Sequence, residues 1–325
     1  MTEKIRWGIL STANIGRGRV IPAIQQSRNG RVLAVASRDL NRAKAFAEDL
    51  NIPRAYGSYE ELIADPDIDA IYNPLPNSMH AEWSIRCAEA GKPTLCEKPL
   101  ASNAAEAQKM VDAFASRDVL FAEAFMYRFH PQTQKVKALV DSGGVGQITV
   151  MSSAFSFAIR PGDDGNIRLS KPLAGGALMD VGCYCINVMR LMTGEEPQSA
   201  HAFANIGSET QVDETLTGAL QFPSGAVGHF DCSLRTSFAH TYEIRGTTGR
   251  IRVAEAFVMP ADKDVVIEHW EASGYSRITI AAANSYTLMV EDFADALIEG
   301  RPPKYAPSDG VANMKVIDML VASLG

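Results

Sequence analysis

The sequence has no long hydrophobic run and no excess of positive charge. No uninterrupted apolar stretch approaches the roughly 20 residues that a membrane-spanning helix needs, so we expect no membrane span. Basic residues number 31 against 38 acidic ones, for a formal net charge of -7, which leaves no basic stripe to bind a nucleic-acid backbone. The first residues also lack the charged region and hydrophobic core of a secretion signal. These absences predict a soluble, cytoplasmic protein that binds neither nucleic acid nor membrane.

The sequence also lacks the cysteine framework of a secreted protein. Its five cysteines are an odd number, which argues against a complete set of disulfides. Cys183 and Cys185 are separated by one residue, not by the two-residue gap of common zinc sites, and no matching pair follows them. Free cysteines are usually small buried side chains. We therefore expect free core thiols and no metal site.

What the sequence does contain is an alternation of two periods in its first 124 residues. Short β-forming runs at 5–10, 32–37, 70–73, 94–97 and 119–122 are separated by helical patterns. This alternation predicts an α/β fold with a Rossmann-type, doubly wound parallel sheet. The chain is 325 residues long, 46% hydrophobic and 21% charged, which is enough for two domains.

After residue 124 the pattern changes. We expect helices near 132–142 and 175–192, a long strand near 147–159, further strands through residue 280, and two closing helices near 286–299 and 308–323. Residues 125–325 therefore read as an α+β domain with a large, mostly antiparallel sheet, which the family resemblance given below implies is open. Residues 1–124 form the first domain in this division.

The segment from Gly8 to Gly16 follows the first expected strand and opens the first helix, as a dinucleotide-binding loop does. Of the three glycine positions in the usual G-x-G-x-x-G pattern, Ser11 and Ala13 replace the first two and Gly16 keeps the third. The alternative is an ordinary turn between a strand and a helix. If the loop binds a dinucleotide, its pyrophosphate ligands are Ser11, Thr12, Ala13, Asn14 and Ile15.

The end of the second strand predicts which dinucleotide binds. NAD enzymes place an acidic residue about 20 residues after the loop, whereas NADP enzymes offer arginine to the 2′-phosphate. Here Ser37 stands in the acidic position and Arg38 follows it. The alternative is a solvated Arg38 with Asp39 as a late ribose ligand. The pattern favours NADP, with NAD as the second choice.

Three further residues form a candidate catalytic group. Lys98 follows the strand-like run 94–97, and the carboxyl ends of parallel strands are where such sheets bind ligands. Asp180 and Tyr184 lie four residues apart on an expected helix, so both can face one site. Hydride exchange with a carbinol carbon needs a group that gives or takes the hydroxyl proton, and Lys98 and Tyr184 can both do so. Taken singly, Lys98 also fits a surface lysine and Tyr184 a core aromatic.

Several motifs in order give the chain a resemblance that spans nearly its full length. They are Trp7–Gly16, Asn73–His80, Glu97–Leu100, Ala122–Pro131 and Gly175–Tyr184. The chain resembles the glucose-fructose oxidoreductase / inositol dehydrogenase (Gfo/Idh/MocA) family. Tyr184, where inositol dehydrogenases carry histidine, makes it most similar to the NADP-dependent D-xylose dehydrogenase and dimeric dihydrodiol dehydrogenase group, as does the segment 166–169.

The resemblance implies roles for individual residues. The lysine, aspartate and proton-transferring residue of the family correspond to Lys98, Asp180 and Tyr184. Arg128 and Arg168 would hold polar substrate groups, or else pair with acidic residues on the surface. Residues from the other motifs that would contact the cofactor are Pro74, Asn77, His80, Glu97 and Lys98, with His80 beside the nicotinamide; taken alone, His80 fits a histidine satisfied by backbone groups.

The expected function is therefore an NADP(H)-dependent oxidoreductase of a sugar or related polyol. By resemblance, it would form a homo-oligomer, a dimer or tetramer, through the sheet of its second domain. One alternative is a regulator that binds NADP without chemistry, although such a sensor has no need of Lys98, Asp180 and Tyr184 together. Another is an NAD-dependent glycosidase of the same fold, which Ser37 and Arg38 disfavour.

Overall fold

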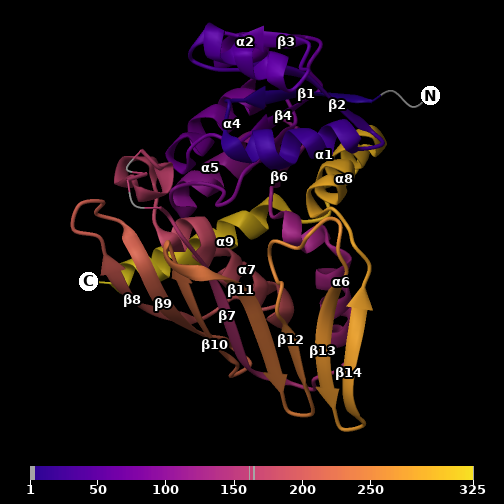
Figure 1. The fold of residues 1–325 in the computed structure, drawn as a ribbon, viewed down its shortest axis with the longest axis vertical. Helices are drawn as coiled ribbons and strands as arrows, with labels where there is room; N and C mark the ends of the chain where they lie inside the picture. The colour runs from indigo at the N-terminus through magenta and orange to yellow at the C-terminus, as the bar shows by residue number, and fades with distance from the viewer. Residues whose placement is uncertain (1–3, 161, 164, 325) are drawn as a thin grey trace. The chain divides into compact units, whose positions relative to one another are not determined.

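The computed structural model describes residues 4–160, 162–163 and 165–324 and contains two compact units (Figure 1). The first comprises Met1–Met126 and Tyr286–Val311, and the second comprises Tyr127–Ser285 and Ala312–Gly325. The predicted boundary after residue 124 assigned everything that follows to the second domain. The structure differs because residues 286–311 return to the first unit.

The first unit is built on a parallel sheet in the order β3-β2-β1-β4-β5-β6. The order reverses between β1 and β4, the point where such sheets bind ligands at the carboxyl ends of their strands. The predicted doubly wound sheet is confirmed. The short β3 was not predicted, because its three residues give too little periodicity. The strands are β1 (Ile5–Leu10), β2 (Gly30–Ala36), β3 (Arg54–Tyr56), β4 (Ala70–Asn73), β5 (Thr94–Cys96) and β6 (Phe121–Glu123).

Three helices of the first unit begin where the sequence supplies a capping side chain. Asp39, Ser58 and Asn103 each accept a backbone hydrogen bond at the start of α2 (Leu40–Asp49), α3 (Tyr59–Ala64) and α5 (Ala104–Ala115). The helix α4 (His80–Glu89) follows a short turn of 3₁₀ helix. The first helix differs from the expected continuous one, since a π-helical turn (Gly16–Val20) precedes α1 (Ile21–Gln26). Pro22 comes just after this π-helical turn, inside a helical run that begins at Asn14, and its missing N–H removes one helical hydrogen bond.

The helix α8 (Ser285–Glu299) explains why the first unit includes a late segment of the chain. The ring of Phe293 lies 5.3 Å from that of Trp7 on β1. Asn29 donates to the backbone oxygen of Glu291 at 2.9 Å and to Asp295 at 2.8 Å. These contacts join residues more than 260 positions apart, so the order of elements along the chain gave no sign of them.

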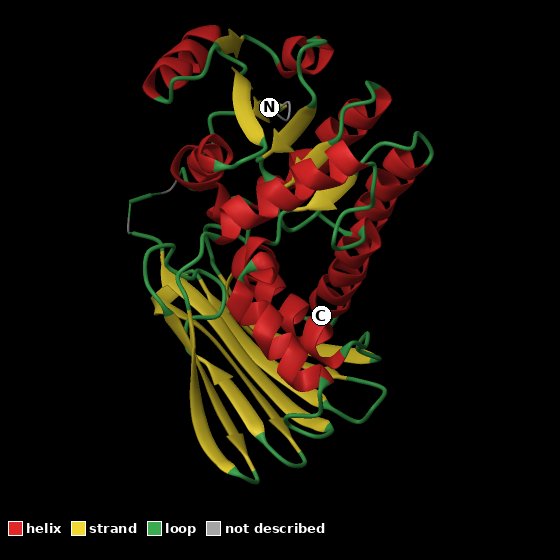
Figure 2. Ribbon diagram, turned by 90° about the vertical axis from the view of Figure 1, so that its right-hand side faces the viewer, coloured by secondary structure: helices red, strands yellow, loops and turns green. Residues whose placement is uncertain are grey.

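The second unit is an open eight-stranded sheet in the order β14-β13-β12-β11-β7-β10-β9-β8. Among the described strands of this second sheet, only β7 and β10 pair in parallel, which confirms the prediction of a mostly antiparallel sheet. Helices cover one face of the sheet (Figure 2). They are α6 (Pro131–Asp141), α7 (Cys183–Thr193) and the end of α9 (Pro307–Ala322). The strands are β7 (Ile148–Ala158), β8 (Ser199–Ile206), β9 (Asp213–Gln221), β10 (Val227–Ser233), β11 (Arg235–Gly246), β12 (Arg250–Val253), β13 (Val265–Glu271) and β14 (Gly274–Ile280).

One helical stretch, Lys171–Thr193, has the length and apolar composition of a helix that could cross a membrane. Its most apolar window is 72% buried inside the structure, as in a core helix that packs against a sheet. The five cysteines are free and buried, which confirms the prediction of core thiols.

Candidate active site

The loop after β1 takes a backbone conformation that favours glycine. Ser11 has a φ of +102° and donates its N–H to the carbonyl of Ala36 at 3.0 Å. The helix then starts at Asn14, and its first N–H groups have no partner within the helix. The Ser11 hydroxyl is buried and makes no hydrogen bond to the described residues. N–H groups without a partner at a helix start are donors that suit a pyrophosphate.

The strained backbone of Ser11 leads to a testable prediction. We expect Ser11→Gly to raise the free energy of unfolding by about 1 kcal/mol, because glycine relieves the positive φ and removes a buried unpaired hydroxyl. Denaturant unfolding of the protein without cofactor measures the effect. Ser11→Ala is the control, since it removes the hydroxyl but keeps the strain. A Ser11→Gly protein no more stable than Ser11→Ala would contradict the prediction.

Arg38 and Arg42, which follow the end of β2, lie near the phenol of Tyr59. Burial raises the pKa of Tyr59, while the positive charges of Arg38 and Arg42 oppose that rise. Asp39 caps α2, with its Oδ1 accepting the N–H groups of Asn41 at 2.8 Å and Arg42 at 3.2 Å. The capping role disfavours Asp39 as a ribose ligand. Sequence reasoning missed Arg42, although its spacing of four residues from Arg38 was a usable signal.

Glu97 and Lys98 follow β5 at the same edge of the parallel sheet. The Tyr72 hydroxyl donates to Oε1 of Glu97 at 2.7 Å, and the Glu97 N–H donates to the carbonyl of Asn73 at 3.0 Å. Burial and the Glu97 charge raise the pKa of Tyr72 and of Tyr286, which opens the part of α8 in this unit. Lys98 is partly exposed, and its peptide bond to Pro99 is cis. Tyr286 is a neighbour of Glu97 that sequence reasoning missed.

The remaining predicted cofactor residues of this unit lie in the loop after β4. Pro74 is buried, and Asn77 starts the short 3₁₀ turn before α4. His80 is fully buried, with Nδ1 3.0 Å from the carbonyl of Pro99 and Nε2 2.7 Å from that of Leu75. With no exposed surface, His80 is placed to hold the Leu75 and Pro99 loops together rather than to contact a cofactor directly.

The burial of His80 predicts a pH dependence of stability. Burial lowers its pKa to about 4 from an ordinary 6.5, so the unfolded chain binds the proton more tightly. The stability contributed by neutral His80 is present above pH 6.5 and is lost as the pH falls toward 4. We expect a contribution of about 2.5 kcal/mol to be lost between pH 7 and pH 4.5. Denaturant unfolding of wild type and His80→Gln at both pH values tests this, and equal pH dependence in the two proteins would refute it.

The second unit places Asp180 and Tyr184 at the start of one long helix. Asp180 lies in a π-helical turn (Leu178–Gly182), and Tyr184 lies in the first turn of α7. Nε of Arg168 donates to Oδ2 of Asp180 at 2.7 Å. The other described π-helical turn follows the β1 loop, so both fall beside predicted functional residues, where such turns are common.

The ring of Tyr184 is packed among three aromatic side chains. Its centroid lies 5.8 Å from Tyr127, 5.2 Å from Phe155 and 5.4 Å from Phe257. Only 5% of Tyr184 is exposed. The packing fixes the direction of the ring, so the phenol group keeps one position relative to Asp180.

The two predicted substrate arginines differ in their surroundings. The Arg168 side chain is 39% exposed and pairs with Asp180, so it holds the predicted catalytic carboxylate. Arg128 is buried, in the 3₁₀ turn Met126–Phe129. The pairing of Arg128 with a surface acid, which we left open, does not fit that burial.

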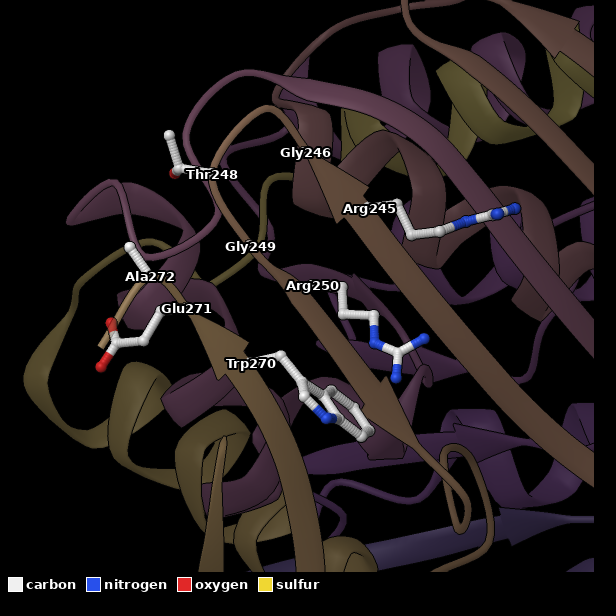
Figure 3. A pocket seen from close by; sticks show the side chains of 8 residues that line it. All are labelled: Arg245, Gly246, Thr248, Gly249, Arg250, Trp270, Glu271 and Ala272. Carbon is white, nitrogen blue, oxygen red and sulfur yellow. The ribbon is translucent and has the colours of Figure 1, made fainter. Parts of the chain in front are cut away.

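A pocket of about 380 Å³ lies elsewhere, between the β11–β12 turn and the end of β13 (Figure 3). The guanidinium of Arg250 lies 3.9 Å from the ring centre of Trp270 there. The residues that line it include none of the predicted site residues. We assign it no part in the chemistry.

The chain matches two family models that together cover most of its length. Residues 5–125 match the oxidoreductase family, NAD-binding Rossmann fold, and residues 133–252 match the GFO/IDH/MocA C-terminal domain. D-xylose 1-dehydrogenase (NADP(+)) 2 of Haloferax volcanii is 39% identical over 317 residues, 98% of this chain and 96% of that protein. Trans-1,2-dihydrobenzene-1,2-diol dehydrogenase of Mus musculus is 37% identical over 255 residues, 77% of this chain and 74% of that protein.

A solved structure extends the comparison. KijD10, a 3-ketoreductase from Actinomadura kijaniata in complex with NADP and TDP-benzene, is 29% identical. The match covers 99% of this chain and 98% of that one, with a TM-score of 0.93. These relatives confirm the predicted fold and an oxidoreductase function with NADP as cofactor. The chain is therefore an oxidoreductase and belongs to the Gfo/Idh/MocA family.

Proposed function

We propose that this oxidoreductase uses NADP(H) to interconvert a CH–OH group and a carbonyl group on a sugar or related polyol. Support comes from the named relatives, a D-xylose dehydrogenase and a 3-ketoreductase. The observation that carries the proposal is the fixed phenol of Tyr184, one helical turn after a carboxylate that is paired with Arg168. A regulator would need neither group.

The first unit offers a fitting set of groups for NADP. The unpaired Ser11 hydroxyl and the N–H groups of Ala13 to Ile15 suit the pyrophosphate. Arg38 and Arg42 suit a 2′-phosphate, because guanidinium groups bind phosphate through paired hydrogen bonds. Ser37 is buried beside them and accepts the N–H of Asp39 at 3.3 Å. When bound, NADP supplies the carbon that accepts or returns the hydride.

The catalytic roles follow from the chemistry of three side chains. Tyr184 takes the proton from the substrate hydroxyl during oxidation and returns it during reduction. The ammonium group of Lys98 stabilises the phenolate and orients the same hydroxyl. Asp180, whose carboxylate is held by Arg168, positions Lys98 or a neighbouring substrate hydroxyl. Arg128 and Arg168 remain proposed substrate contacts, and Arg168 has the exposed surface for it.

An absorbance assay at the reduced-nicotinamide band tests the proposed function. NADP and NAD are each tested with a panel of aldoses, polyols and diols, and NADPH with ketosugars. We expect turnover with at least one sugar or polyol, and faster with NADP than with NAD. If NADP binds and no member of the panel reacts, the NADP-binding regulator becomes the better account. Sugar release without net reduction of the cofactor would favour the glycosidase.

We further propose that the protein acts as a homo-oligomer, a dimer or tetramer, through the face of the eight-stranded sheet that the helices leave uncovered. Large apolar side chains are exposed on strands of this sheet: Phe203 is 81% exposed and Phe238 is 60% exposed. Exposed apolar groups of this size favour an interface. The proposal includes a cytoplasmic location, because free thiols favour a reducing compartment.

A further inference from the structure

The start of the helix that carries Asp180 and Tyr184 is held by a carboxylate from another strand. Asp213 is the first residue of β9, and its Oδ2 accepts the N–H of Leu178 at 2.6 Å. The N–H of Ala177 also donates to this carboxylate. These two N–H groups lie at the helix start, where the positive end of the helix dipole favours a negative charge.

Two glycines let the chain pass beside this carboxylate. Gly176 has a φ of +115°, and any side chain there would clash with Oδ1 of Asp213. The Gly176 N–H donates to the carbonyl of Arg168 at 2.8 Å, and a side chain at Gly175 would clash with the same carbonyl. The glycine pair therefore runs between the backbone of Arg168 and the carboxylate of Asp213.

The hydrogen bonds around the glycine pair continue to the proposed catalytic groups. The N–H of Asp180 donates to the carbonyl of Gly176 at 3.0 Å, while its carboxylate accepts Nε of Arg168. Arg168 thus binds the helix start through its backbone and Asp180 through its side chain. Tyr184 follows one turn later, so a shift of the first turn moves both catalytic groups together.

We propose that Asp213 is a positioning residue for the reaction, which fixes the first turn of the helix and so the directions of Asp180 and Tyr184. The inference rests on the proposed function, because it assigns Asp213 to those two residues. Groups that face Asp213 are the N–H groups of Ala177 and Leu178 and the thiol of Cys232 on β10. Burial raises the pKa of Asp213 to about 6, so an assay at pH 7.5 keeps the carboxylate charged.

The test compares Asp213→Ala, Asp213→Asn and the control Asp231→Asn at pH 7.5. Asp231 is an exposed carboxylate on β10 that touches none of the catalytic residues in the contacts described above. The assay uses NADP with D-xylose, or with the sugar or polyol of the panel that turns over fastest. Circular dichroism checks folding, and NADPH fluorescence measures cofactor affinity.

We expect Asp213→Ala to lower kcat about tenfold, since small displacements of catalytic groups cost one to two orders of magnitude in rate. The NADPH affinity should stay within about twofold, because the nucleotide site belongs to the other unit. Asp213→Asn keeps an oxygen that accepts the same N–H groups and should recover most of kcat. Asp231→Asn should match wild type.

A folded Asp213→Ala protein with wild-type kcat would overturn the inference, as would equal losses in kcat and NADPH affinity. If Asp213→Ala does not fold, Asp213→Leu decides, because leucine fills the same space but accepts no N–H group: lowered kcat with retained NADPH affinity supports the inference, and wild-type kcat contradicts it. Tyr184→Phe separates the two proposals. Full activity of Tyr184→Phe would defeat the proposed roles themselves, whereas an inactive Tyr184→Phe with an active Asp213→Ala defeats this inference alone.

Discussion

Tyr184→Phe should lower kcat by about a hundredfold to ten-thousandfold, the usual contribution of a side chain that transfers a proton in the reaction. The variant keeps the ring that packs against Phe155 and Phe257 and loses only the hydroxyl. Folding and cofactor binding should therefore be unchanged. The measurement is steady-state kinetics with saturating NADP, together with NADPH binding by fluorescence.

Tyr242→Phe is the matched control for this experiment. Tyr242 is buried on β11, its ring also packs against Phe257, and its hydroxyl has no hydrogen-bond partner among the described residues. Its loss should leave kcat unchanged. Lys98→Met should reduce kcat to a similar extent as Tyr184→Phe, because both residues act on one proton. If either Tyr184→Phe or Lys98→Met kept wild-type turnover, the assigned roles would be wrong.

Replacing Arg38 and Arg42 together with alanine should weaken NADP binding by about a hundredfold to ten-thousandfold, with NAD binding nearly unchanged. Each guanidinium that binds a phosphate contributes about 1.5 to 3 kcal/mol to the binding free energy. NAD has no 2′-phosphate, so the NAD complex does not lose this contribution when the arginines are replaced. Titration calorimetry with both nucleotides measures the change in preference. Higher salt should narrow the difference between wild type and variant.

Arg31→Ala is the control for the cofactor experiment. Arg31 is an exposed arginine on the same strand, β2, near its amino end, whereas ligands bind at the carboxyl ends. We expect its removal to leave both affinities unchanged. An Arg38, Arg42 double variant that lost NAD and NADP affinity equally would show that these residues hold the fold or the shared part of the cofactor, not the 2′-phosphate.

Much of the fold could be predicted because periodicity is a local property. The alternation of strands and helices in residues 5–123 and the hairpins of residues 199–280 appear directly in the sequence. The return of α8 to the first unit could not be predicted, because it depends on packing between Trp7 and Phe293 and on hydrogen bonds from Asn29. Such long-range contacts leave no periodic signal.

The residues of the site also fall into those that the sequence could predict and those that it could not. Residues in continuous motifs, such as Lys98 and Tyr184, could be proposed from spacing and resemblance. Arg42 carried a spacing signal that was overlooked. Tyr286 and Asp213 could not be proposed, because each acts on a residue far away in the sequence. For His80 the sequence predicted too much. Its position in a motif suggested a contact with the cofactor, but in the structure both ring nitrogens lie against backbone carbonyls.

Isotope transfer tests the central claim most directly. The fastest substrate of the panel is prepared with deuterium on its reacting carbinol carbon and incubated with the enzyme and NADP, and the NADPH formed is analysed by mass spectrometry. A hydride transferred from that carbon to the nicotinamide predicts NADPH that carries the deuterium, and at least about a hundredfold less of it from Tyr184→Phe over the same time. Unlabelled NADPH, or label released to water, would contradict the account.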